Sequence, residues 1–262
     1  MKNLRNLSNA SFLFFSLFFL LIACQDEPSL RMPATGQEGT DPFTATLGGN
    51  EPPNASIGEL IPQQEAVDLT AQYQLGNPDQ PAAYFIGSSK VQQLLDLPGM
   101  VALRWIFGYT STSELTIIVE PLIETASGTV VADDEQLIQL IAPEGYEAAS
   151  PYYHGGETPA PTLSVTDGES ISLVDAQSLL DTYQLAFAGQ GRSYVQGRDL
   201  IESLLSSHPT PGLWLFLGED ELSNQEVLVT PSNQGNATPS YLVGDRSSPC
   251  PPLCFFTSQL AL

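Results

Sequence analysis

The sequence predicts an α+β fold made of two copies of a helix–helix–strand–strand module that share an antiparallel sheet. The first observation is a repeat: aligned with itself at an offset of 110 residues, the chain matches positions 61–121 to positions 171–231 without a gap. Of these 61 aligned positions 16 are identical, where unrelated segments of this composition would share roughly four. The second observation is that both copies change from helical to strand-like hydrophobic spacing at the same place.

The first half of each copy has the pattern of two helices. Small and apolar residues recur at the spacing of one helix face, and Ser172 with Asp175 forms a capping box at the start of the second copy. A second apolar stretch follows a glycine and ends at Pro98 and Gly99 in copy one and at Pro209 in copy two. The faces of the first helices comprise Ala66, Leu69 and Tyr73 in copy one and Ala176, Leu179, Leu180 and Tyr183 in copy two.

The second half of each copy has the pattern of a β-hairpin, because short runs of β-branched and aromatic residues flank a polar turn. The tail 129–142 predicts a strand followed by a helix, and the tail 240–243 predicts a third strand. We expect the two hairpins to merge into one sheet with four helices on one face, and two separate domains are the alternative. The predicted strands are 101–107 with 115–119, and 213–217 with 226–229.

The N-terminus has the pattern of an export signal. Lys2 and Arg5 precede an apolar run from Phe12 to Ile22 that is shorter than the roughly 20 residues of a membrane span. Leu21-Ile22-Ala23-Cys24 resembles the lipobox of bacterial lipoproteins. That resemblance implies lipid attachment to Cys24 and cleavage before it, which places the protein at the outer membrane on its periplasmic or cell-surface side. An ordinary signal peptide with a chance cysteine is the alternative.

The segment after Cys24 is rich in proline, glycine and acidic residues, which predicts a disordered tether. Gln25-Asp26-Glu27 resembles the acidic export signal of Bacteroidetes surface lipoproteins, and a plain acidic linker is the alternative. The expected organisation is a signal peptide over 1–23, a tether over 24–60, copy one over 61–142, a linker over 143–170, copy two over 171–254 and a C-terminal extension over 255–262.

The charge of the chain excludes one class of partner. The formal net charge is −22, and removal of Lys2 and Arg5 with the signal leaves six basic and 30 acidic residues, 6 − 30 = −24. A field of this sign repels nucleic acid and anionic lipid head groups. We therefore expect the membrane to be contacted through the lipid on Cys24, and the ligand to be a protein or a glycan.

No recognisable catalytic set is present in the sequence. The only two histidines are His154 and His208, and no Gly-x-Ser-x-Gly elbow accompanies them. Phosphate-binding and metal-binding motifs are also missing, and the acidic runs 133–135 and 219–221 are typical of solvated turns. We expect a non-catalytic binding or structural module without metal or cofactor. An envelope hydrolase that uses carboxylates is the alternative.

Polar residues at matched positions of the two copies give the candidate binding surface. Tyr84 and Tyr194, together with Arg198 and Asp199 of copy two, are the proposed members. The alternative is that these tyrosines bury their rings and bond to loop carbonyls, while matched glutamines close helix ends. The other matched pairs are Tyr73 with Tyr183, Gln74 with Gln184 and Gln80 with Gln190.

The tail contains Cys250-Pro251-Pro252-Leu253-Cys254. In an oxidising compartment two cysteines so close in sequence favour a disulfide between Cys250 and Cys254, provided that the chain turns between them. A bridge to another chain, free thiols and a metal site are the alternatives. Copy two and this tail resemble a family of small uncharacterised Bacteroidetes proteins, through 194–218, 227–229 and 245–254. That resemblance covers about a third of the chain and implies no activity.

Overall fold

The computed structural model describes residues 54–81, 83–112, 114–143, 162–187, 193–221, 225–233, 243–245, 248–250 and 260, the backbone alone at 245 and 248–250. All of them belong to one compact unit that spans 47–262. The predicted signal peptide, Cys24, Cys254 and the tether up to residue 53 lie outside these residues. The lipid anchor and the disulfide therefore stay predictions.

The described strands form two antiparallel sheets. The first has the order β1 (Glu59–Ile61), β11 (Val243–Asp245), β10 (Gln225–Pro231), β9 (Gly212–Glu219), β2 (Ala83–Gly87). The second has the order β12 (Ser248–Cys250), β8 (Ser193–Gly197), β3 (Met100–Tyr109), β4 (Leu115–Glu124), β6 (Ile138–Leu140), β7 (Glu169–Ser170), and β5 (Val130–Ala132) also pairs with β4. The described helices are α1 (Gln63–Gly76), α2 (Ser88–Leu95), α3 (Leu173–Ala186) and α4 (Arg198–Ser206).

The same order of elements occurs in both halves of the chain. The first half runs β1, α1, β2, α2, β3, β4, and the second half runs β7, α3, β8, α4, β9, β10. Helix α1 begins at Gln63 and α3 at Leu173, and β4 begins at Leu115 and β10 at Gln225. Both offsets are 110 residues, the offset of the sequence repeat.

The two halves exchange strands between the sheets. Strand β2 of the first half pairs with β9 of the second, with Tyr84 opposite Leu215. Strand β8 of the second half pairs with β3 of the first, with Tyr194 opposite Trp105. Both pairings have the same register when 110 is added, so each sheet consists of a hairpin from one half completed by a strand from the other.

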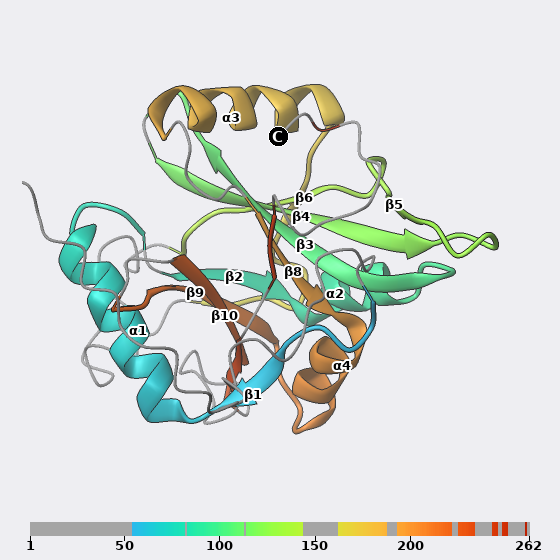
Figure 1. The fold of residues 1–262 in the computed structure, drawn as a ribbon, viewed down its shortest axis with the longest axis horizontal. Coiled ribbons are helices and arrows are strands. Elements are labelled where there is room, and N and C mark those ends of the chain that lie inside the picture. Colours follow the sequence, from blue (N-terminus) through green and yellow to red (C-terminus); the bar gives the residue numbers. More distant parts are fainter. Residues whose placement is uncertain are drawn as a thin grey trace, which may run out of the picture. The chain divides into compact units, whose positions relative to one another are not determined.

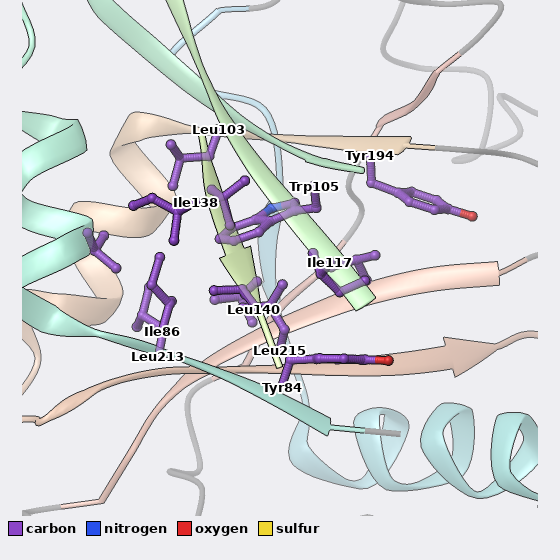
Figure 2. Close-up of a cluster of buried hydrophobic side chains, with 14 of the residues drawn as sticks. Tyr84, Ile86, Leu103, Trp105, Ile117, Ile138, Leu140, Tyr194, Leu213 and Leu215 are labelled. Atoms are coloured by element: carbon purple, nitrogen blue, oxygen red, sulfur yellow. The ribbon is translucent and has the colours of Figure 1, made fainter. Parts of the chain in front are cut away.

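The inner faces of the sheets form the main core. Trp105 and Leu103 of β3 meet Leu213 and Leu215 of β9 between the two sheets (Figure 2). On the outer faces, α1 packs on β9 and α3 packs on β3 (Figure 1). The apolar faces of α2 and α4 also pack into the core between the sheets, through Val91, Leu94, Leu95, Leu200, Ile201 and Leu204.

Two glycines allow close backbone approach at equivalent places. The amide of Gly87 donates to the carbonyl of Asp167 at 2.9 Å, and the amide of Gly197 donates to the carbonyl of Ile57 at 2.8 Å. A Cβ on Gly197 would lie 2.2 Å from the carbonyl oxygen of Ala55, far inside van der Waals contact. Each half therefore anchors the segment that leads into its own first strand on the strand between its two helices.

The structure confirms the α+β class, both hairpins and the capping box, in which Ser172 Oγ accepts from the Asp175 amide at 3.2 Å. The single merged sheet is wrong, because each hairpin has one strongly apolar face and the two faces are buried against each other. The module also contains a strand between its helices, β2 or β8, which sequence pattern missed because all five residues are buried and do not alternate.

Several boundaries also differ from the predicted ones. The tail of copy one forms strands β5 and β6 and not a strand followed by a helix. Residues 54–60 belong to the fold and not to the tether, since β1 pairs with β11 and Ile57 is buried. The second half likewise begins before 171, with β7, and Leu260 of the predicted C-terminal extension is buried beside α3. These segments are too short to show a hydrophobic period of their own.

Candidate functional site

Four tyrosines gather where α1 and α3 end, and we call this place the tyrosine end. It comprises Tyr73, Tyr84, Tyr109 and Tyr183, with Phe187, Gln80 and Glu219 around them. Tyr73 and Tyr183 occupy equivalent positions in the two helices, and both are buried. Strands β3 and β9 end here at Tyr109 and Glu219, so both halves of the chain contribute to the site.

The aromatic rings of the tyrosine end contact each other in a chain. Tyr109 meets Phe187 edge to face with ring centres 5.4 Å apart, and Phe187 lies 4.9 Å from Tyr183. Tyr183 in turn lies 5.8 Å from Phe107 of β3. Offset and edge contacts of this kind stabilise aromatic pairs. Tyr109 and Phe187 are half-buried, so the ring chain runs from the core to the surface.

Burial controls the ionisation of the inner tyrosines. It raises the pKa of Tyr73 far above its ordinary value, and the nearby Tyr183, Glu219 and Tyr109 raise this pKa further. The pKa of Tyr84 is also raised by burial, with Tyr73 and Tyr109 adding to the shift. Desolvation disfavours the phenolate, so both hydroxyls stay protonated at physiological pH.

Gln80 and Glu219 place polar groups beside these rings. Gln80 Nε2 donates to the Tyr109 hydroxyl at 3.2 Å. The Oε1 atom of Gln80 is buried and has no hydrogen-bond partner among the described residues. The carboxylate of Glu219 lies at the end of α1, where a Cβ on Gly76 would be 3.5 Å from its Oε2 atom. The site thus offers an acceptor oxygen and a carboxylate beside half-buried rings.

Two leucines at the tyrosine end are exposed to solvent. Leu75 in the last turn of α1 is 70% exposed, and Leu185 at the equivalent position of α3 is 88% exposed. Leu185 is two residues before Phe187, and Leu75 is next to Gly76 beside Glu219. Exposed apolar side chains next to half-buried rings are typical of interaction surfaces.

The structure places the predicted surface residues differently from one another. Tyr84 and Tyr194 are buried, with hydroxyls that point to the same side of the core (Figure 2). Tyr84 donates to the carbonyl of Leu115 at 2.9 Å, and Tyr194 donates to the carbonyl of Gln225 at 2.7 Å. Both therefore have the geometry of the alternative interpretation, a buried ring that bonds a carbonyl, and neither ring reaches the surface. The carbonyls belong to the first residues of β4 and β10.

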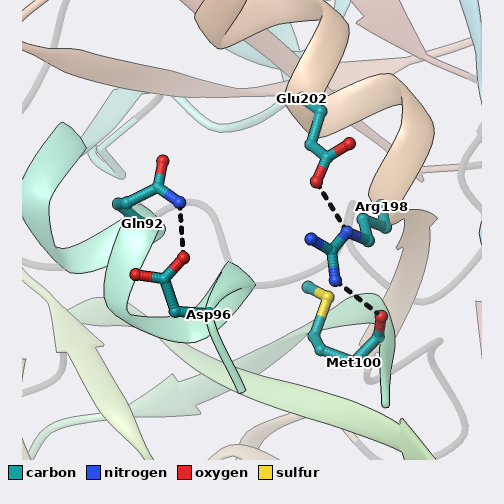
Figure 3. Close-up of polar contacts among 5 residues, drawn as sticks. All are labelled: Gln92, Asp96, Met100, Arg198 and Glu202. Carbon is teal, nitrogen blue, oxygen red and sulfur yellow. Dashed lines mark hydrogen bonds and ion pairs between the residues drawn. The ribbon is translucent and has the colours of Figure 1, made fainter. Parts of the chain in front are cut away.

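Arg198 and Asp199 lie at the start of α4, away from the two tyrosines. Arg198 Nε donates to Glu202 at 2.6 Å, and its Nη1 atom donates to the carbonyl of Met100 at 3.4 Å (Figure 3). The Asp199 amide donates to the carbonyl of Ala55, while its side chain is exposed. Arg198 therefore joins α4 to β3, and the four predicted residues do not form one patch.

An ion pair that the sequence analysis missed lies on the outer face of the second sheet. Arg104 of β3 pairs with Glu120 of β4, directly opposite in the ladder, and the two side chains are 1% and 0% exposed. Burial lowers the pKa of Arg104, and the neighbouring Glu120 acts in the opposite direction. The available signal was a single charge within each of two apolar runs. The equivalent positions of the first sheet hold Trp214 and Thr230.

Within the described part of the chain, no group of three or more histidine, cysteine, aspartate or glutamate side chains is placed to hold a metal ion. The acidic runs 133–135 and 219–221 both fall within the part searched. His208 bonds to Ser207 and to the carbonyl of Ser232 after the end of α4, whereas His154 is outside the described residues. None of the helices seen in this part has the length and apolar composition to span a bilayer.

The pair of sheets with exchanged strands was also compared with known proteins. No protein-family model, curated protein or solved structure matches this chain.

Proposed function

We propose that the protein is a lipid-anchored binding protein of the bacterial cell envelope, with a body built from two copies of one module. Support for the duplication comes from the equal offset of 110 residues in sequence, in element starts and in strand register. Support for the anchor comes from Leu21-Ile22-Ala23-Cys24 behind an apolar run. The ligand site that we assign is the tyrosine end.

One observation carries the binding role. The two equivalent helices α1 and α3 both expose a leucine in their last turn, at the place where half-buried aromatic rings reach the surface. Leaving a leucine in water forgoes about 1.5–3 kcal/mol of burial. A surface that does so twice, beside Tyr109 and Phe187, has the composition of a protein-binding site, in which aromatic anchors dominate the affinity. The tether would hold this surface away from the membrane.

Site-specific photo-crosslinking in cells tests the binding surface. A photoreactive benzoylphenylalanine at position 185 or 75 is expected to form covalent adducts with a partner. The matched control is position 174, because Val174 is 78% exposed in the first turn of the same helix α3. Adducts at position 174 of the same yield, or none at 185 and 75, would contradict the assignment of the tyrosine end.

Metabolic labelling tests the anchor separately. Cells that produce the protein and are given a radioactive fatty acid should label the wild-type chain, and Cys24→Ala should abolish the label completely, because lipid attachment needs the Cys24 sulfur. Equal label on both proteins would show that Cys24 is not lipidated. An immunoblot of total protein is the control for expression.

A further inference from the structure

We infer that the partner at the tyrosine end presents a cationic side chain, arginine or lysine, to the ring of Phe187 and the carboxylate of Glu219. This inference rests on the proposed binding function and names the chemistry of the ligand. Three independent features of the site lead to it: the distribution of charge, the two helix ends and the exposed ring faces.

Charge around the tyrosine end has one sign. The turns that meet there contribute carboxylates and, among the described residues, no basic side chain. The described basic residues are Lys90 and Arg198, near the starts of α2 and α4 at the other ends of β2 and β8, and Arg104, which is buried. The carboxylates of these turns are Asp79, Glu114, Glu219, Asp220 and Glu221.

The helix ends add to the negative potential. Both α1 and α3 direct their C-terminal carbonyl groups at the tyrosine end, and neither helix has a basic residue in its last turn. A helix C-terminus carries about half a negative charge, which favours a nearby cation. In most proteins a lysine or arginine of the same chain neutralises it. The described residues supply none here, so a partner's cation would do so.

The aromatic rings select a cation that also has an apolar surface. Arginine and lysine bind over ring faces within about 6 Å, and arginine also stacks on them. Phe187 is half-buried and held by Tyr109 and Tyr183, so little ring mobility is lost on binding. The buried and unpartnered Oε1 atom of Gln80 would accept a hydrogen bond from a guanidinium or ammonium group. Leu75 and Leu185 would contact the apolar part of the bound segment.

Fluorescence anisotropy with a labelled hexa-arginine peptide tests the inference on the full lipidated chain in nonionic detergent. A hexa-citrulline peptide of nearly the same shape but without charge is the ligand control. We expect the arginine peptide to bind at least tenfold more tightly than the citrulline peptide, and to weaken with added salt. Glu219→Gln, which preserves shape, and Phe187→Ala should each weaken arginine binding about fivefold.

Two control variants separate specific recognition from general attraction to an acidic protein. Glu135→Gln removes one charge from the exposed β5–β6 turn, and Val174→Ala shortens an exposed apolar residue of α3. Both should change the affinity less than twofold. Equal losses for Glu135→Gln and Glu219→Gln, or equal binding of the citrulline peptide, would overturn the inference. Adducts at position 185 without an arginine preference would overturn the cationic partner and leave the binding surface in place.

Discussion

Replacing Arg104 by methionine is expected to lower the free energy of unfolding by about 3–5 kcal/mol. Methionine fills a similar volume, so the loss comes from electrostatics and not from a cavity. The variant leaves the carboxylate of Glu120 in a site where its side chain is 0% exposed and its partner cation is gone. A buried charge without a partner costs several kcal/mol. Urea unfolding followed by circular dichroism measures the change.

The double variant Arg104→Met with Glu120→Leu is the control for this prediction. It removes both charges and keeps the volume nearly constant, so its stability should lie within about 1 kcal/mol of the wild type. The other half of the chain already holds Trp214 and Thr230 at the equivalent positions. The fold therefore does not need an ion pair there. A double variant as unstable as the single one would mean that the pair stabilises the sheet directly.

Alanine at Gly197 is expected to destabilise the protein by about 3 kcal/mol. The new Cβ would lie 2.2 Å from the carbonyl oxygen of Ala55 and 2.6 Å from the amide nitrogen of Ile57. Both contacts are with backbone, which cannot rotate away as a side chain would. The segment 55–57 must move, which breaks the bond from the Gly197 amide to the Ile57 carbonyl. Thermal unfolding gives the loss of stability.

Gly87→Ala should lose a similar amount, because its Cβ would lie 2.3 Å from the carbonyl oxygen of Val165. Gly76→Ala is the matched control, since its Cβ meets only the end of the Glu219 side chain, at 3.5 Å. Alanine at the end of α1 should leave stability unchanged or raise it by about 0.5–1 kcal/mol. Equal losses at positions 76, 87 and 197 would contradict the steric explanation.

The sequence predicted the elements better than their pairing. Helix α3 was visible because Ala176, Leu180 and Tyr183 follow the helical period and Ser172 caps it. The partner of each hairpin was not visible, since β2 and β9 are far apart in the chain and β2 is as apolar as any strand of the core. Strand pairing depends on long-range packing, which local patterns do not encode.

The candidate site was partly visible in the sequence. The match of Tyr73 with Tyr183 identified two residues of the tyrosine end, but Tyr84 and Tyr194 were assigned to a surface although both are buried. Tyr109, Phe187 and Glu219 have no matching residue in the other half, so the repeat gave no signal for them. Only the meeting of both helix ends with β3 and β9 brings these side chains together.

Nuclear Overhauser contacts between backbone protons test the exchange of strands between the two halves most directly. The account predicts close Hα contacts between Phe85 and Trp214 and between Val195 and Arg104, which face each other across the two exchanged pairings. If each half instead kept its own strand, the contacts would join Phe85 to Arg104 and Val195 to Trp214. Those contacts would contradict the exchanged fold and, with it, the site that both halves build.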